Sequence, residues 1–242
     1  MELNRIYNID CVEGMKMLES ESIDLVVTSP PYDNLRKYNG FEWDFEKTAK
    51  QLYRVVKDGG VVVWIVGDAT VNGSETGTSF KQALFFKEIG FNLHDTMIWE
   101  KPTFTATGSL RVRYAPVFEY MFVFSKGAPK TFNPIKDKRN ISTGRKIHGT
   151  VRQIDGSTKK QSCVGNLIQE FGQRHNVWKI NPEKSNKNRK HPAVFPEQIA
   201  NDHIISWSNE GDVVLDCFMG SGTTAKMAMP AMGLVRTLSM AS

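Results

Sequence analysis

One short stretch combines residues that could hold a planar amino group. Thr28, Ser29, Pro30, Pro31 and Tyr32 follow an apolar run directly. The prolines lack an N–H for a strand ladder and fix the local carbonyls in direction. The Ser29 hydroxyl oxygen and the Pro30 carbonyl could then accept hydrogen bonds from an –NH2 group, while Tyr32 stacks on the ring that bears it. Such bonds would present the nitrogen lone pair to an electrophile. A plain Pro-Pro turn with a packing tyrosine fits these residues equally well, so the rest of the chain must decide.

A second stretch could bring backbone N–H groups close to a ligand. Gly220 and Gly222 lie between an apolar strand pattern and a predicted helix. A glycine motif indicates a ligand site more strongly when it lies between a strand and a helix. Glycine has no Cβ, so the backbone N–H groups at the start of the helix can come close to a ligand. A tight strand-to-helix turn without a ligand would look similar.

The elements that must position these stretches alternate along the chain. Apolar runs predict strands at 23–28, 61–66, 93–99, 117–124 and 212–216. Residues 6–11 fit a short strand or an extended start, and 177–180 fit one ordered element within the segment 126–190. Caps and apolar periodicity predict helices at 12–18, 44–57, 79–89 and 197–207, with Asp44 as an N-cap. The pattern predicts an α/β fold with a doubly wound, mostly parallel sheet, in which ligands bind at the carboxyl ends of the strands.

The positive charge is concentrated in one segment. Residues 126–190 contain sixteen Lys or Arg and four acids, a net charge of +12 in a chain whose total is +5, so the remainder carries −7. Such a concentration is typical of nucleic-acid binding, whereas a solvated surface loop usually mixes both signs. We therefore expect a loop-rich basic insertion at 126–190 between a half at 1–125 and a half at 191–242. The candidate DNA-binding residues are Arg111, Arg113, Lys136, Lys138, Arg139, Arg145 and Lys146.

Other classes of protein are not favoured. No run of 18 apolar residues and no N-terminal signal pattern occurs, which predicts a soluble cytoplasmic protein without a membrane span. The widely spaced Cys11, Cys163 and Cys217 form neither a disulfide framework nor a metal-binding pattern. No metal site is expected.

Taken in this order, the motifs resemble those of a known family. Thr-Ser-Pro-Pro-Tyr at 28–32 and Asp-Cys-Phe-Met-Gly-Ser-Gly-Thr-Thr at 216–224 are similar to the signatures of S-adenosylmethionine-dependent DNA amino-methyltransferases. Their order along the chain is that of the permuted β group of this family. In that group the catalytic motif comes first, a target-recognition region follows, and the cofactor loop comes last. The stretches 10–11, 99–102 and 191–196 fit the group as well, so the resemblance extends to about Met229.

The resemblance implies a Rossmann-like methyltransferase fold, S-adenosylmethionine as cofactor and double-stranded DNA as partner. It also implies a prokaryotic or phage context with a possible cognate restriction endonuclease. The basic insertion would be the target-recognition region. The implied catalytic residues are Ser29, Pro30, Pro31 and Tyr32. The implied cofactor-binding residues are Asp10, Cys11, Phe195, Asp216, Phe218, Gly220, Ser221, Gly222, Thr223 and Thr224.

The target atom is a separate question. Ser at position 29 favours the N4 amine of cytosine, because the family's N6-adenine members usually carry Asp there. Adenine N6 stays open as an alternative, and so does methylation of RNA or of protein amides, for which Asn at this position is common. C5-methylation of cytosine would need a nucleophilic Cys, commonly beside a Pro, and none of the three Cys has a Pro neighbour.

The C-terminal segment departs from the family pattern. The expected second strand should end in an acid that binds the cofactor ribose, about 20 residues past the glycine turn. Pro230 interrupts the helix, and 231–242 contains no acid. We expect truncated C-terminal strands, a strand at 212–216 near a raw sheet edge, and impaired cofactor affinity. A catalytically weak or dead DNA-binding protein is therefore an alternative, as is a natural tail in which another residue binds the ribose.

Overall fold

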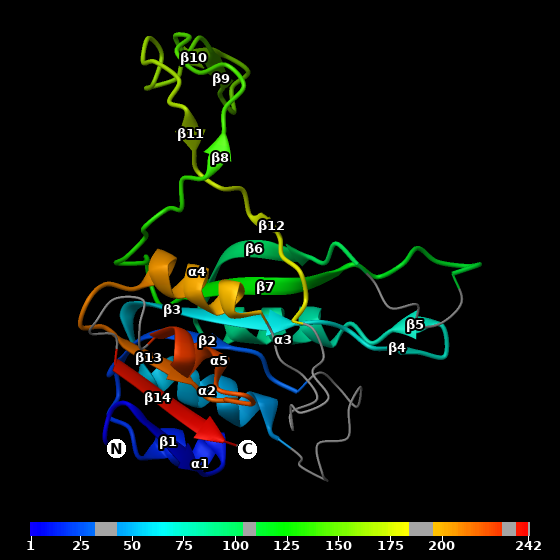
Figure 1. Ribbon diagram of the computed structural model, residues 1–242, viewed down its shortest axis with the longest axis vertical. Helices are drawn as coiled ribbons and strands as arrows, with labels where there is room; N and C mark the ends of the chain where they lie inside the picture. The colour runs from blue at the N-terminus through cyan, green and yellow to red at the C-terminus, as the bar shows by residue number, and fades with distance from the viewer. Residues whose placement is uncertain (32–42, 104–109, 184–195, 229–235, 242) are drawn as a thin grey trace. The chain divides into compact units, whose positions relative to one another are not determined.

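The computed structural model describes residues 1–31, 43–103, 110–183, 196–228 and 236–241. Its chain forms two compact units, one of residues 1–133 with 176–242 and one of residues 134–175. They are called the large unit and the ribbon unit below, and each is described separately (Figure 1).

The large unit is built on an eight-stranded sheet in the order β1-β14-β13-β2-β3-β7-β6-β12. All neighbouring pairs are parallel except those of β7 with β3 and with β6. The strands of this sheet are β1 (Arg5–Asn8), β2 (Ile23–Thr28), β3 (Val56–Val66), β6 (Asn92–Glu100), β7 (Phe118–Ser125), β12 (Val177–Lys179), β13 (Val213–Asp216) and β14 (Arg236–Ala241). A separate hairpin pairs β4 (Thr70–Val71) with β5 (Ser74–Glu75). The predicted doubly wound, mostly parallel sheet is confirmed.

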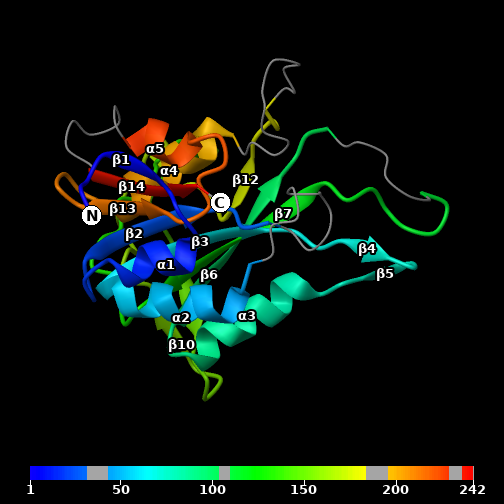
Figure 2. The ribbon, with the colours of Figure 1, turned by 90° about the horizontal axis from the view of Figure 1, so that it is seen from below.

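Helices cover both faces of this sheet, as Figure 2 shows. They are α1 (Cys11–Lys16), α2 (Phe45–Val55), α3 (Thr78–Glu88), α4 (Glu197–Trp207) and α5 (Thr223–Ala228). Along β2, Val26 packs into the core beneath α1–α3, and Val27 into the core beneath α4 and α5. Because successive side chains of a strand point to opposite faces, both must be apolar. This explains the continuous apolar runs in the sequence.

The α2 region illustrates where local signals suffice and where they fail. Asp44 is the N-cap, as predicted, and its carboxylate accepts a hydrogen bond from Lys47 N–H at 3.0 Å. The helix was predicted to reach Lys57 but ends at Val55, and β3 starts at once. Gly59 lies inside that strand with φ +78°, where the register against β2 shifts. Gly59 and Gly60, which follow the predicted end of the helix, form an irregularity within the strand.

The expectation of a raw edge at the 212–216 strand is wrong. β13 lies between β2 and β14, and β1 in turn covers β14. Val214 pairs with Thr237 on one side and with Leu25 on the other. A strand ladder uses only backbone N–H and C=O groups. Residues 236–241 can therefore complete the sheet although they lack the acidic side chain of the family pattern.

The ribbon unit is a long antiparallel pair of chain segments. Its regular pieces are β8 (Lys138–Arg139) with β11 (Phe171–Gly172) and β9 (Thr150–Arg152) with β10 (Thr158–Lys160). Between them, Ile147 N–H donates to the Asn166 carbonyl at 2.8 Å. At the tip, the Asp155 carboxylate accepts from Ser157 N–H at 2.9 Å and from its hydroxyl at 2.7 Å. Residues 134–175 carry nine Lys or Arg and three acids.

The core beneath α1–α3 should depend strongly on Phe86. Its ring is fully buried and stacks on Phe124, with the ring centroids 4.5 Å apart. Phe86→Ala should lower the free energy of unfolding by about 3–5 kcal/mol, because the lost ring leaves a cavity. Leu84→Ala on the same helix is the matched control, since Leu84 is 66% exposed and should change stability by less than about 0.5 kcal/mol. Urea denaturation measures both, and equal effects would contradict this packing.

Candidate functional site

The candidate acceptor turn lies at the carboxyl end of β2, in the middle of the sheet. Thr28 is the last strand residue and pairs with Trp64 of β3. Pro30 is buried, whereas Ser29 and Pro31 are half-buried. Tyr32 lies outside the described residues. The strand therefore stops where the prolines predict, and it leaves a partly accessible serine at the edge of the sheet where ligands of α/β proteins bind.

The candidate glycine turn follows β13, which pairs with β2. Gly220 and Gly222 have φ values of +50° and +80°, a region that L side chains rarely adopt. Among the described residues other than Gly222 and its two chain neighbours, no heavy atom lies within 4 Å of the position that a Cβ on Gly222 would occupy. The hydroxyl oxygens of Ser221 and Thr223 are 3.1 Å apart. The sequence thus builds a tight turn with open space beside one glycine.

Buried hydrogen bonds join the two turns. The Thr28 hydroxyl donates to Asp216 Oδ1 at 2.8 Å. Asp216 Oδ1 also accepts from Phe218 N–H at 3.1 Å, which holds the start of the glycine turn. From the other side, the Thr224 hydroxyl donates to the Val27 carbonyl at 3.1 Å. The structure therefore brings together the ends of two strands that are 188 residues apart in the chain.

Asp216 occupies an unusual environment for a carboxyl group. Burial raises its pKa from 3.8 to about 6, although the hydrogen bonds from Thr28 and from Phe218 N–H, and the nearby Thr224 hydroxyl, partly offset this effect. Its Oδ2 atom is buried and has no hydrogen-bond donor in the described part of the chain. An unpaired buried oxygen is costly, so this atom suits a ligand group that donates hydrogen bonds.

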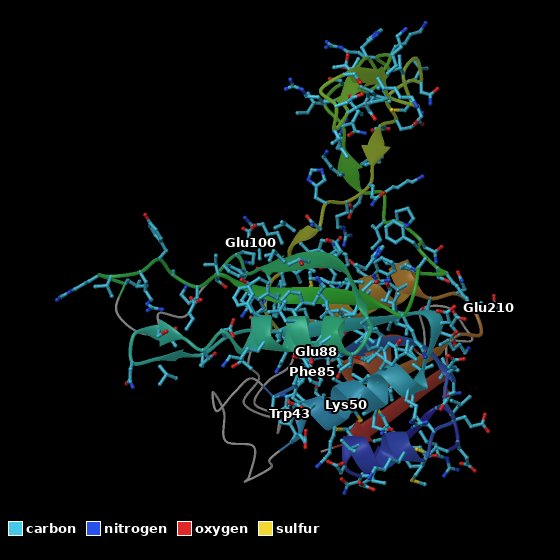
Figure 3. The ribbon with its side chains drawn as sticks, turned by 180° about the vertical axis from the view of Figure 1, so that it is seen from behind. Trp43, Lys50, Phe85, Glu88, Glu100 and Glu210 are labelled. Atoms are coloured by element: carbon cyan, nitrogen blue, oxygen red, sulfur yellow. The ribbon has the colours of Figure 1, made fainter. Side chains whose placement is uncertain are left out.

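An aromatic group packs against the glycine turn. The rings of Phe218 and Trp43 meet edge to face, with centroids 5.0 Å apart, and Trp64 lies 6.1 Å from Phe218. Trp43 directly precedes Asp44, the N-cap of α2 (Figure 3). Neither tryptophan, nor Thr28 with its side-chain bond to Asp216, was predicted as a site residue. Thr28 precedes the Ser-Pro-Pro motif, and that position was the available signal.

Asp10 and Cys11 have local structural roles. Asp10 is the N-cap of α1, and its carboxylate accepts from Val12 N–H at 2.9 Å and from Glu13 N–H at 3.1 Å. The Cys11 thiol is buried beside Thr48, and burial raises its pKa to about 11. Burial also raises the pKa of Cys217 well above its usual value. Neither thiol is ionised at neutral pH, so neither is an activated nucleophile.

An ion pair lies along the same edge of the sheet. Lys101, just after β6, pairs with Glu119 of β7, and its ammonium lies 4.8 Å from the centroid of the Trp99 ring. The Trp99 indole N–H donates to the Ile180 carbonyl at 2.8 Å. These contacts join β6, β7 and the segment after β12.

The candidate DNA-binding residues fall into two groups. In the ribbon unit, Lys136, Lys138, Arg139, Arg145 and Lys146 are all exposed. Of these, Arg139 is 3.9 Å from Glu170. In the large unit, Arg111 is exposed, and Arg113 donates to the Thr70 hydroxyl at 3.1 Å and to the Gly73 carbonyl at 2.6 Å.

Two further features bear on the predictions. Phe195 lies outside the described residues. Among the residues that the structure describes, no group of three or more His, Cys, Asp or Glu could hold a metal ion. No helix within the same ranges is long and apolar enough to cross a membrane.

Comparisons with known proteins agree with this geometry. A family described as DNA methylase, N6_N4_Mtase, matches residues 23–231. The orphan methyltransferase M.BamHII of Bacillus amyloliquefaciens is 58% identical over 214 residues, which cover 86% of this chain and 80% of the relative. The PvuII DNA methyltransferase (cytosine-N4-specific) aligns with a TM-score of 0.68 at 21% identity, over 98% of this chain and 80% of that one. M1.HpyAVI, solved as a complex with SAM, aligns with a TM-score of 0.62 at 22% identity, over 98% and 93%.

The environment of Asp216 predicts a pH-dependent stability. Its pKa is higher in the folded chain, about 6, than the ordinary 3.8, so folding favours the protonated carboxyl. The resulting stabilisation is fully present below pH 4 and is lost as the pH rises through 6, a change of about 3 kcal/mol. Asp216→Asn should remove it, so the difference in unfolding free energy between variant and wild type should shift in favour of the variant between pH 4 and pH 7. Denaturant titrations of both proteins in the same buffers measure this. A difference that does not vary with pH would contradict the shifted pKa.

Proposed function

We propose, from the premise that this chain belongs to the N6/N4 DNA methylase family, that it moves a methyl group from S-adenosylmethionine to the N4 amine of cytosine in DNA. One observation carries the proposal: the hydrogen bonds of Asp216 with Thr28 and of Thr224 with Val27 hold the acceptor turn beside the glycine turn. Methyl transfer requires an amine and a methyl donor side by side, and proximity of this kind lowers the barrier. The PvuII enzyme of the same fold is named cytosine-N4-specific, which supports the choice of atom.

In the proposed reaction, Ser29 and Pro30 orient the amine. The Ser29 hydroxyl oxygen and the Pro30 carbonyl accept hydrogen bonds from the two N–H groups, so that the nitrogen lone pair leaves conjugation with the ring. Pro31 keeps that carbonyl rigid, because its ring fixes the backbone. Tyr32 stacks on the flipped-out base, since the target nitrogen is not accessible within a base-paired duplex.

The residues of the glycine turn fit the methyl donor. S-Adenosylmethionine, when bound, would supply a methyl group on a positively charged sulfur that is already electrophilic. The S–CH3 bond would break as the N–CH3 bond forms, so that S-adenosylhomocysteine leaves and the amine releases one proton. Gly220 and Gly222 would let the backbone approach it, and the open space beside Gly222 leaves room. Asp216 would accept a hydrogen bond from the amino group of its methionine part, because Oδ2 has no donor in the described ranges. Phe218, Ser221, Thr223 and Thr224 would complete this wall of the site, with Asp10, Cys11 and Phe195 toward its other end. M1.HpyAVI was solved with SAM, which supports the assignment.

The ribbon unit fits the DNA partner. Its exposed Lys and Arg would contact phosphates, and a two-stranded β-ribbon has the width that the major groove admits. We propose that residues 134–175 hold the duplex, within the wider target-recognition region 126–190. M.BamHII is named an orphan methyltransferase, so a cognate restriction endonuclease is not part of this proposal. A cytoplasmic location accords with a DNA substrate.

Two other functions are each favoured by a specific observation. Adenine N6 is the second candidate acceptor, because the matched family includes both N6 and N4 specificity. A DNA-binding protein with weak or no transfer is the other, because residues 231–242 contain no acid for the cofactor ribose. The two are separated by the next experiment.

Wild-type protein incubated with DNA and tritiated S-adenosylmethionine should place label on N4-methylcytosine after digestion to nucleosides. Ser29→Ala should lower the rate at least about 100-fold, as loss of one preorganised hydrogen-bonding group does in other enzymes. Ser22→Ala, just before the other end of β2, is the matched control and should retain activity, since its hydroxyl donates to the Glu19 carbonyl, away from the acceptor turn. Label on N6-methyladenine would establish the alternative acceptor.

The absence of label on either base would contradict the leading proposal. Calorimetric titration with S-adenosylmethionine then identifies the cause. Millimolar or undetectable affinity would support the weak or dead DNA-binding protein, whereas micromolar affinity would rule out a defective cofactor site.

DNA binding should depend on the ribbon unit. The double variant Arg145→Ala, Lys146→Ala should reduce the slope of log affinity against log salt by up to about 2, because each phosphate contact contributes roughly 0.9. Lys47→Ala, Lys50→Ala on α2 removes the same charge from an exposed helix and should leave the slope unchanged. Fluorescence anisotropy with a labelled duplex at several salt concentrations measures both. Equal slopes for the two variants would show that the ribbon does not contact phosphates.

A further inference from the structure

We propose that Tyr114 acts as a wedge that enters the base stack of duplex DNA beside the flipped target base. The wedge belongs to an arm that comprises residues 110–114 and the β4–β5 hairpin, residues 70–75. This inference rests on the proposed function, because it presumes that a base leaves the duplex. It adds a residue that no motif of the sequence indicated.

The arm carries four large apolar side chains that are exposed. Tyr114 is 97% exposed, Val112 is 81% exposed and Leu110 is 45% exposed. Val71, on the hairpin, is 56% exposed. Single exposed apolar residues are ordinary, but a cluster rimmed by charge indicates an interaction site.

Arg113 fastens this segment to the hairpin. Its guanidinium donates to the Thr70 hydroxyl at 3.1 Å and to the Gly73 carbonyl at 2.6 Å, so it contacts the first residue of β4 and the turn of the hairpin. Asn72 and Gly73 have φ values of +49° and +82°, as a tight two-residue hairpin turn requires. We therefore assign Arg113 a positioning role, through the hairpin, rather than a role as a phosphate ligand alone.

The arm lies at the same edge of the sheet as the acceptor turn. The hairpin follows the carboxyl end of β3, and residues 110–114 lead to the start of β7. Val66 of β3 pairs with Tyr120 of β7, and Thr28 of β2 pairs with Trp64 of β3. Both ribbon views show the hairpin and the chain before β7 projecting together beyond this edge (Figures 1 and 2).

DNA is the occupant that the chemistry of the arm favours. Arg111 and Arg113 flank the apolar side chains, and the stretch 101–117 contains no acid. Positive charge attracts phosphates, and the stacked bases between the phosphates offer an aromatic ring a partner to stack on. Extrusion of a base leaves a gap and unstacks its neighbours, which costs free energy. Apolar side chains inserted between base steps are a known means of stabilising such distorted DNA, and an aromatic ring also stacks on bases.

Photocrosslinking tests the contact without requiring catalysis. The full-length protein is made with p-benzoylphenylalanine in place of Tyr114 and irradiated with a radiolabelled plasmid fragment. A covalent protein–DNA product should form at position 114. The control carries the same probe in place of Met17, which is 61% exposed at the opposite edge of the sheet, after α1. No product at 114, or crosslinks between two protein chains instead, would overturn the proposal.

Kinetics test the wedge itself. The substrate is a duplex carrying the recognition sequence, mapped first by sequencing DNA methylated by the wild type. Tyr114→Ala should lose about tenfold or more in rate on the paired duplex but little on a duplex with a mispaired target base, because mispairing removes most of the cost of extrusion. Tyr114→Phe should retain the wild-type rate on both. Equal losses on both substrates, or no loss, would overturn the wedge. If the wild type methylates no DNA, the proposed function fails, and the crosslink alone decides whether Tyr114 contacts DNA.

Discussion

The buried hydrogen bond between Thr28 and Asp216 is the interaction on which the site depends. It joins the end of β2 to the end of β13, two segments 188 residues apart in the chain. A buried hydrogen bond to a carboxyl group contributes on the order of 1–3 kcal/mol, and leaving either group unpaired costs as much. The bond between Thr224 and Val27 closes the same junction from the helix side. The position of the acceptor turn relative to the glycine turn thus follows from a few short contacts.

This junction explains why an acidic residue is kept in a buried position. Burial opposes the charged form of Asp216, so the carboxyl is a cost to folding near neutral pH. The same carboxyl accepts bonds from Thr28 and from the backbone of Phe218, and so holds two strand ends in register. The arrangement exchanges some stability for a defined geometry, which is common where a site must be preorganised.

The residues proposed to bind DNA phosphates differ from those proposed to take part in methyl transfer. The candidate acceptor turn contains neutral groups, the Ser29 hydroxyl and the Pro30 carbonyl, which in the proposed reaction bind the amine without pairing with phosphate. The basic side chains gather on the ribbon unit, which has nine Lys or Arg, and on the arm with Arg111 and Arg113. DNA affinity and methyl transfer can therefore be altered independently. On the arm, apolar and basic groups lie together at the same edge of the sheet as the acceptor turn.

The sequence by itself determined the local elements and the identity of both turns. Apolar runs, the Asp44 cap and the two prolines act over a few residues, so their outcome at β2, α2 and the acceptor turn could be predicted. Only the tertiary structure decided which distant groups meet. Three of these contacts join residues that are far apart in the chain: β14 pairs with β13, Thr28 bonds to Asp216, and Arg113 is attached to the hairpin. The physical reason is that strand pairing uses backbone groups common to all residues, and a side-chain bond depends on which strands are neighbours, information that no local pattern contains.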